Sequence, residues 1–121
     1  MAKRILAVDD SAIIRQVEQN VLAPAGYELV LANDGKEALA KLETGTFNLI
    51  ITDLNMPNMD GVSLIKAVRG GKSHKFTPII MLTTESKDTK KQEGKAAGAT
   101  GWVVKPFTSE QLLAVVKKVI G

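Results

Sequence analysis

Five short apolar runs recur along the chain, and each is followed by a longer stretch whose apolar residues are spaced as on one face of a helix. Most of the runs are continuously apolar, which is typical of parallel strands that are covered on both faces of a sheet. Strands that alternate with amphipathic helices indicate an α/β fold. The five predicted strands are Arg4 to Val8, Tyr27 to Ala32, Leu49 to Thr52, Ile79 to Thr83 and Trp102 to Val104.

The segments after the runs predict five helices, and four of these have a favoured N-cap residue. The four N-caps are Ser11, Asp34, Asp60 and Thr108. The second and fifth helices also show capping-box spacing, because Glu37 and Gln111 follow their caps by three residues. The fourth helix, in the segment 86–97, is highly charged and contains Gly94, so we expect it to be the weakest of the set.

The first helix is predicted from an apolar stripe that should face the core. The stripe consists of Ile13, Ile14, Val17, Val21 and Leu22. Glycines mark the ends of two helices: Gly26 lies beyond the end of the first, and Gly70 with Gly71 ends the third.

Right-handed crossover connections restrict such a chain to a small number of topologies. We expect a flavodoxin-like (βα)5 fold, which is a three-layer sandwich whose parallel sheet has the strand order 2-1-3-4-5. The chain contains no linker, repeat or low-complexity segment, and 121 residues suit one domain. We therefore expect a single domain over residues 1–121.

The composition argues against several kinds of protein. The chain has no cysteine, so it can form neither disulfides nor thiolate metal sites. No apolar run approaches the roughly 20 residues that cross a bilayer, and we expect no signal peptide before the first strand. We expect a cytoplasmic protein without membrane insertion. The net charge of +3 comes from scattered basic residues with few aromatics, so we expect no binding to DNA.

Polar residues follow four of the five predicted strands directly, at the edge where an α/β sheet of this order places its site. They are Asp9 and Asp10 after the first strand, Asp53 after the third, Thr83 and Thr84 at the end of the fourth, and Lys105 after the fifth. Taken alone, Asp9 and Asp10 are explained equally well as a turn and cap, and Asp53 and Lys105 are more often loop residues. Because all of them fall at strand ends, the sequence predicts that three carboxylates, two hydroxyls and one ammonium converge.

This set of groups suits phosphoryl transfer assisted by Mg²⁺. Clustered carboxylates raise one another's pKa unless a cation lies among them, and Mg²⁺ prefers oxygen ligands and pairs with phosphate. Lys105 and the metal would neutralise the phosphoryl oxygens, and Thr83 would donate a hydrogen bond. Asp53 stands alone at the middle strand, so it is the candidate nucleophile that would form an acyl phosphate.

The chain resembles bacterial response-regulator receiver domains over its full length, with a pattern closest to chemotaxis regulators of the CheY type. The matching motifs are Val8-Asp9-Asp10-Ser11, Asp53-Leu54-Asn55-Met56-Pro57-Asn58-Met59-Asp60-Gly61, Met81-Leu82-Thr83-Thr84 and Val103-Val104-Lys105-Pro106-Phe107. The last three motifs at these spacings are highly specific.

The resemblance implies that a partner histidine kinase phosphorylates Asp53. It also implies that Asp10, Asp53 and the backbone carbonyl of Asn55 hold Mg²⁺, with Asp9 helping through water. Lys105 would pair with the carboxylate or phosphoryl group, and its bond to Pro106 would be cis.

The resemblance further implies a switch made of Thr83 and an aromatic residue. Thr83 would move towards the phosphoryl group and leave space for the aromatic three residues before the lysine, which is Trp102 in this chain. Many chemotaxis regulators look to have tyrosine there, so tryptophan is a departure. Asn55 and Glu85 occupy the positions that influence the attacking water, and their pairing implies self-dephosphorylation in seconds to minutes.

The family signals through its fourth helix, fifth strand and fifth helix, where a downstream protein target binds. In this chain that region is basic, which is typical of a solvated helix face and would also suit an acidic partner. The basic residues are Lys87, Lys90, Lys91, Lys95, Lys117 and Lys118. We expect a monomer when the protein is unphosphorylated.

Two other classes of function fit the sequence less well. A Mg²⁺-dependent aspartyl-phosphate phosphatase usually has its nucleophile after the first strand and carries inserted cap segments. A flavin- or nucleotide-binding module needs a phosphate loop after the first strand, where Asp9 and Asp10 have the wrong charge. We expect no effector domain after Gly121 and no catalysis beyond the protein's own phosphorylation and dephosphorylation. Chemotaxis output is favoured, and a role as a phosphorelay intermediate stays open.

Overall fold

A computed structural model describes residues 3–54, 56, 59–71, 74–84 and 88–121, with the side chains of residues 88–91 excepted. Within these residues the strands form a parallel five-stranded sheet of order β2-β1-β3-β4-β5, which confirms the predicted topology. Three strands differ by one residue from the prediction. The strands are β1 Arg4–Val8, β2 Glu28–Ala32, β3 Leu49–Asp53, β4 Ile79–Thr83 and β5 Gly101–Val104.

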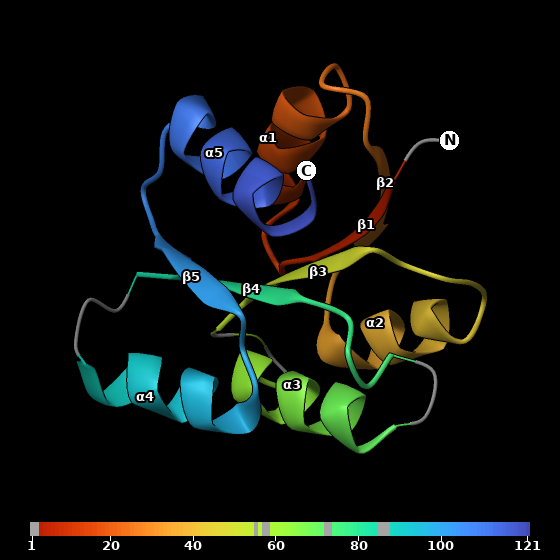
Figure 1. Cartoon of the computed structure of the whole chain (residues 1–121), viewed down its shortest axis with the longest axis vertical. Helices are drawn as coiled ribbons and strands as arrows, with labels where there is room; N and C mark the ends of the chain where they lie inside the picture. Colours follow the sequence, from red (N-terminus) through yellow and green to blue (C-terminus); the bar gives the residue numbers. More distant parts are fainter. Residues whose placement is uncertain (1–2, 55, 57–58, 72–73, 85–87) are drawn as a thin grey trace.

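Helices cover both faces of the sheet, so the molecule has the three layers expected (Figure 1). Two helices, α1 Ala12–Leu22 and α5 Ser109–Ile120, lie together on one face. The opposite face is covered by α2 Gly35–Leu42, α3 Gly61–Gly70 and α4 Asp88–Ala97.

The sheet separates two apolar clusters because successive side chains of a strand point to opposite faces. Leu6 and Ile50 belong to the cluster under α2 and α3, whereas Ile5 and Ile51 belong to the cluster under α1 and α5. All four side chains are fully buried. Burial on both sides explains why the strands read as continuous apolar runs.

The predicted N-caps are confirmed at α1, α2, α3 and α5, where Ser11, Asp34, Asp60 and Thr108 accept a hydrogen bond from a backbone N–H three residues later. The capping box of α5 is complete. At α2 the second half differs, because the Glu37 carboxylate accepts from the N–H of Asn33, 2.9 Å away. That residue precedes the cap, so Glu37 stabilises the entry to α2 one position earlier than the pattern predicts.

Four of the five residues in the predicted stripe of α1 are buried or partly buried, and Ile13 is the exception. Ile13 is 77% exposed, whereas Glu18 and Leu22 are completely buried. Glu18 and Leu22 lie on the same face of the helix as the partly buried Ile14, at intervals of four residues. Packing against the sheet and α5 selected this face, although it carries a carboxylate, and left Ile13 outside.

Arg69, near the end of α3, joins three backbone segments. Its guanidinium donates to the carbonyl of Gly98 after α4, at 2.8 and 3.1 Å, and to those of Lys75 and Thr77 before β4, at 3.1 and 2.6 Å. Hydrogen bonds from a charged donor contribute more than neutral ones. This side chain therefore fixes the loops that precede β4 and β5.

We expect Arg69→Met to lower the free energy of unfolding by about 2 kcal/mol, because three carbonyls lose a charged donor while the apolar stem is kept. Urea unfolding followed by circular dichroism measures the change. Lys66→Met, which removes an exposed cation from the same helix, is the control and should change stability by less than about 0.5 kcal/mol. Equal effects of the two substitutions would contradict this role of Arg69.

Candidate functional site

The carboxyl ends of β1, β3, β4 and β5 bring the predicted polar residues to one edge of the sheet. Asp9 directly follows β1, Asp53 ends β3 and Thr83 ends β4. All three side chains are buried, with exposed fractions of 0, 7 and 1%. Lys105 follows β5 and is half-buried, whereas Asp10 is exposed. The three predicted carboxylates and the ammonium therefore come together, whereas Thr84 is exposed after the end of β4.

Lys105 bridges two of the aspartates. Its Nζ donates to Asp9 Oδ2 at 2.9 Å and to Asp53 Oδ1 at 3.0 Å. The backbone N–H of Lys105 donates to the carbonyl of Thr83 at 2.7 Å, so the residue is anchored to the end of β4. The peptide bond to Pro106 is cis, as the resemblance implies. The ammonium is thereby placed between the carboxylates of β1 and β3.

Backbone and side-chain donors hold the two bridged aspartates in place. Asp9 Oδ1 accepts from the N–H of Ser11 at 2.9 Å, and Arg15 Nη1 donates to the Asp9 carbonyl at 2.6 Å. Asp53 Oδ1 accepts from the N–H of Leu54 at 2.9 Å. Both oxygens of Asp9 thus accept a hydrogen bond, whereas the two bonds to the Asp53 carboxylate go to the same oxygen, Oδ1.

The carboxylates of Asp9, Asp10 and Asp53 offer oxygen atoms that all lie within 4.8 Å of one another. A hard divalent cation takes this kind of oxygen ligand and offsets the repulsion between the acids. The three carboxylates therefore fit the Mg²⁺ ion that the sequence predicts. Asn55, whose backbone carbonyl was expected to be a further ligand, lies outside the described residues.

The site raises the pKa of both of its central groups, whereas a simple ion pair would lower the pKa of the carboxylate. Burial raises the pKa of Asp53 above its usual value, and the nearby Asp9 adds to this, although Lys105 opposes both. For Lys105, burial alone would lower the pKa, but its bonds to Asp9 and Asp53 outweigh burial and raise it. Asp53 is therefore more basic than an ordinary aspartate, which favours its action as a nucleophile.

The two residues expected to form a switch lie on the neighbouring strands β4 and β5. Thr83 is buried at the end of β4, and Trp102 is partly buried on β5, where it contacts the apolar cluster under α2 and α3. A groove of about 440 Å³ lies along Trp102, Pro106, Gln111 and Val115, between β5 and α5. Glu85, expected to tune dephosphorylation together with Asn55, lies outside the described residues.

Gly61 is a site residue whose role the sequence reasoning missed. A Cβ atom at this position would lie 2.4 Å from the carbonyl oxygen of Asp53 and 3.0 Å from Leu54 Cα. The N–H of Gly61 also donates to the carbonyl of Leu54 at 2.8 Å. The start of α3 thus rests directly on the backbone that carries Asp53, which only a glycine permits. The motif that contains Gly61 was the one available signal.

Glu18 is a second residue that the sequence reasoning missed. Its side chain on α1 is completely buried, and neither carboxylate oxygen has a hydrogen-bond partner among the described residues. Burial, together with the charge of Asp9, raises the pKa of Glu18 to about 8, against the opposing charges of Lys105 and Arg15. The one signal for its burial in the sequence is that Glu18 is four residues from both Ile14 and Leu22, and so lies on the same face of the helix.

None of the helices in the described part of the chain is both long and apolar enough to cross a bilayer.

Comparison with protein families matches residues 5–117 to the response regulator receiver domain. The chemotaxis protein CheY of Pseudomonas aeruginosa is 39% identical over 117 residues, which cover 96% of this chain and 94% of that protein. The chemotaxis protein CheY-3 of Vibrio cholerae is 38% identical and covers 96% of this chain and 90% of its own length.

Solved structures agree with this family in fold. The chemotaxis protein CheY4 of Vibrio cholerae superposes with a TM-score of 0.95 and is 55% identical, over 98% of this chain and 99% of that chain. The receiver domain of a sensor histidine kinase from Pseudomonas aeruginosa, which has a magnesium ion coordinated in its active-site cleft, has a TM-score of 0.91 and is 27% identical. It covers 100% of this chain and 99% of that chain.

Proposed function

This chain belongs to the family of response regulator receiver domains, and from this we propose that it accepts a phosphoryl group on Asp53 from a histidine kinase. The observation that carries the proposal is the bridge from Lys105 Nζ to Asp9 and Asp53, which aims a cation at the one carboxylate that ends the middle strand. The described residues thus combine a basic carboxylate with a positive charge beside it.

The reaction is a transfer between two residues. A carboxylate oxygen of Asp53 attacks the phosphorus of a phosphohistidine, the new O–P bond forms and the P–N bond breaks. The electron pair of that bond stays on the imidazole nitrogen, which takes up a proton. Lys105 then stabilises the phosphoryl oxygens, and Thr83 donates a hydrogen bond to them. We propose that catalysis by this chain is confined to this step and to the hydrolysis of its own acyl phosphate.

We assign Asp9, Asp10, Asp53 and the backbone carbonyl of Asn55 as the residues that hold Mg²⁺. When bound, the ion neutralises charge on the phosphoryl oxygens. The short distances among the three aspartate oxygens support this assignment. A cytoplasmic location follows from the proposal, because the histidine kinase takes its phosphoryl group from ATP in the cytoplasm.

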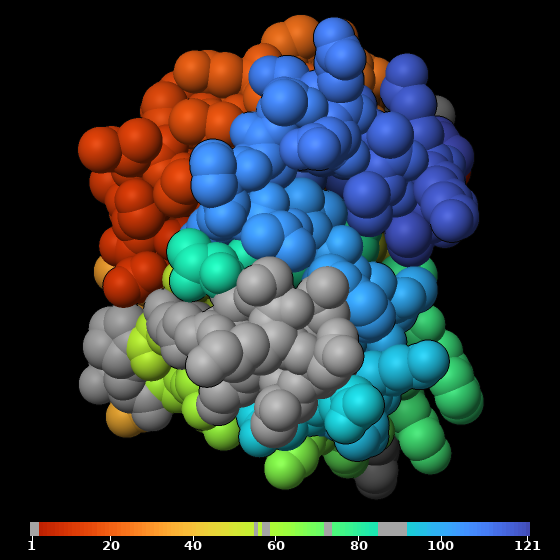
Figure 2. All heavy atoms as spheres, turned by 90° about the vertical axis from the view of Figure 1, so that its left-hand side faces the viewer, coloured from red at the N-terminus to blue at the C-terminus, as the bar shows by residue number. Residues whose placement is uncertain are grey.

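The proposed output surface is formed by α4, β5 and α5, with Trp102 and Thr83 as its switch. Figure 2 shows β5 and α5 in blue on one face, with α4 in cyan below them. Lys95, Lys117 and Lys118 are exposed in this region and favour an acidic partner segment. The identity to chemotaxis proteins favours a chemotaxis target over a phosphorelay, and at micromolar concentration we expect a monomer before phosphorylation.

The proposal is tested by Trp102 fluorescence during titration with beryllofluoride, with and without Mg²⁺. We expect a saturable, Mg²⁺-dependent change, because the mimic occupies the place of the phosphoryl group beside Lys105 and Thr83. Asp53→Asn should abolish the change. Asp34→Asn is the matched control, since it removes the charge of an aspartate that caps α2 and leaves an equally good cap.

Intact mass after incubation with acetyl phosphate separates the acceptor from its readout. One phosphoryl adduct in the wild type and in Asp34→Asn, and none in Asp53→Asn, would support the acceptor even if the fluorescence stayed constant. A wild-type protein without any adduct would overturn the proposed function.

A further inference from the structure

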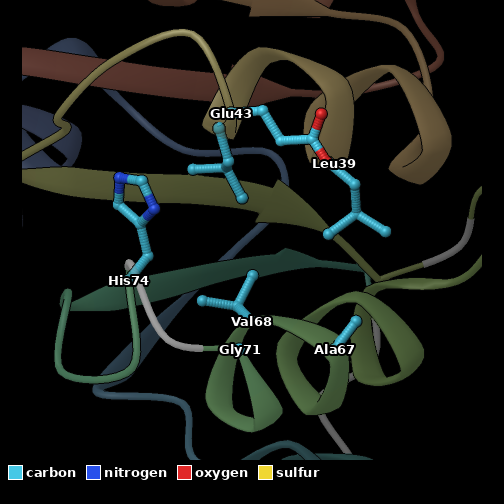
Figure 3. Close-up of a pocket in the computed structure, with 7 residues that line it drawn as sticks. Leu39, Glu43, Ala67, Val68, Gly71 and His74 are labelled. Atoms are coloured by element: carbon cyan, nitrogen blue, oxygen red, sulfur yellow. The ribbon is translucent and has the colours of Figure 1, made fainter.

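A cavity of about 340 Å³ lies between α2 and α3, away from the phosphorylation site (Figure 3). Its walls are apolar and come from both helices: Leu39, Leu42, Ala67 and Val68. The volume falls in the range of ligand pockets and exceeds what one aromatic side chain needs. The cavity can therefore accept a bulky apolar group.

Two polar residues bound this cavity. The exposed Glu43, which is the C-cap of α2, has its carboxylate beside Leu39 in Figure 3. His74 lies at one end, is only 7% exposed, and has its ring centroid 6.0 Å from that of the buried Phe47. Its Nε2 has no hydrogen-bond partner within the described part of the chain. The cavity thus has the buried His74 ring at one end and the negative charge of Glu43 at its rim.

The segment next to the cavity presents an apolar side chain to solvent. Phe76, two residues after His74, is 88% exposed, the highest value among the large hydrophobic residues that the structure describes. Lys75 Nζ lies 5.8 Å from the centroid of the Phe76 ring. The aromatic ring and the cation therefore form one exposed unit.

Hydrogen bonds hold the backbone of this unit in place. The N–H of Thr77 donates to the carbonyl of His74 at 3.2 Å, which closes a turn around Lys75 and Phe76. Arg69 donates to the carbonyls of Lys75 and Thr77. A backbone that is already ordered reduces the conformational entropy lost on binding, which favours Phe76 as an interface anchor.

We propose that this edge is a self-association surface, in which Phe76 of each copy enters the α2–α3 cavity of a second copy. Lys75 then lies near Glu43 of the other copy, so charge complements shape. Because the projecting ring and the cavity are neighbours on one edge of the molecule, a two-fold axis can satisfy both contacts at once. An apolar cavity with an acidic rim complements an exposed aromatic ring with a cation beside it. This complementarity favours a second copy of this chain as the partner.

The surface lies at the opposite edge of the sheet from Asp53, since the segment 74–77 precedes β4 whereas Asp53 ends β3. The dimer therefore leaves the phosphorylation site and the α4–β5–α5 face accessible. With two aromatic anchors the interface is at the small end of the size range, so we expect a dissociation constant on the order of 100 µM. A monomer at micromolar concentration is compatible with this value.

Sedimentation equilibrium of the unphosphorylated protein from about 10 µM to about 1 mM tests the proposal. We expect a reversible monomer–dimer equilibrium that Phe76→Ser weakens at least about tenfold, as for loss of a central aromatic anchor. Ile13→Ser removes a side chain that is 77% exposed on α1 and should leave the equilibrium unchanged. Asp53→Asn should also leave it unchanged, so this result is independent of the proposed phosphorylation.

A charge exchange identifies the partner surface. Lys75→Glu and Glu43→Lys should each weaken the dimer about threefold to tenfold, because like charges then face each other in both contacts. The double variant restores the attraction and should recover most of the affinity. A protein that is monomeric at about 1 mM, or a dimer that Phe76→Ser does not weaken, overturns the proposal. A dimer that the double charge variant fails to restore overturns the assigned pairing.

Discussion

Replacing Glu18 by methionine is expected to raise the free energy of unfolding by on the order of 4 kcal/mol near pH 9. In the folded protein burial and the charge of Asp9 raise the pKa of Glu18 from 4.5 to about 8. An ionised Glu18 would be a buried charge without a hydrogen-bond partner among the described residues. Methionine keeps an unbranched side chain of similar length and removes the carboxyl group.

The pH dependence of this gain has a defined sign. Between the pKa of Glu18 in the unfolded chain and the higher pKa in the folded chain, the folded state binds more protons. The contribution of Glu18 to the free energy of unfolding therefore falls as pH rises from 4.5 to about 8. Above this window the contribution is constant. The difference between Glu18→Met and wild type should thus be small near pH 4 and reach its full size above about pH 8.

Urea unfolding at a series of pH values measures this difference. Glu18→Gln should remove the same pH-dependent part while keeping a buried polar group, and the exposed Glu110→Gln is the control that should follow the wild type. A difference between Glu18→Met and wild type that stays constant over the whole window would mean that Glu18 does not titrate on folding with a raised pKa.

Replacing Gly61 by alanine is expected to lower the free energy of unfolding by about 3 kcal/mol and to impair phosphorylation of Asp53. The added Cβ would lie 2.4 Å from the Asp53 carbonyl oxygen and 3.0 Å from Leu54 Cα. Both are backbone atoms, so no side-chain rotation relieves the contact. Either α3 or the backbone of Asp53 must move, and the carboxylate then leaves its place beside Lys105.

Gly70→Ala is the matched control, because it adds the same methyl group to the other end of α3. No atom lies within 4 Å of a Cβ at this position. Alanine has the higher helix propensity, so the control should stabilise by up to about 1 kcal/mol. Urea unfolding and the mass of the acetyl-phosphate product report stability and acceptor function separately. An unchanged rate of adduct formation in Gly61→Ala would show that the contact does not position Asp53.

The sequence predicted the sheet order and the meeting of Asp9, Asp53 and Lys105 at one edge, because both depend on local or topological rules. A continuous apolar run indicates a buried strand, and right-handed crossovers then determine its neighbours. Once the order is known, Asp9, Asp53 and Lys105 must come to one edge. The caps of four helices were predicted for the same reason, since a cap bonds to a residue three positions away.

Other features could not be predicted because they depend on contacts between distant parts of the chain. The stripe on α1 was compatible with two helix faces, and packing against α5 and the sheet buried Glu18 instead of Ile13. The α2–α3 cavity likewise exists only because these two helices lie side by side, with His74 at one end of the space between them. No residue in either segment indicates this on its own.

By itself, then, the sequence determined which residues stand at the carboxyl ends of the strands, and thereby the chemistry that the site can perform. The tertiary structure alone decided that Lys105 bonds to Asp9, 96 residues away, as well as to Asp53. It also decided that Gly61 rests on the backbone of Asp53 and that Glu18 is buried. The physical reason is that strand and cap signals act over a few residues, whereas burial, contact and pKa are set by all the elements that pack around a group.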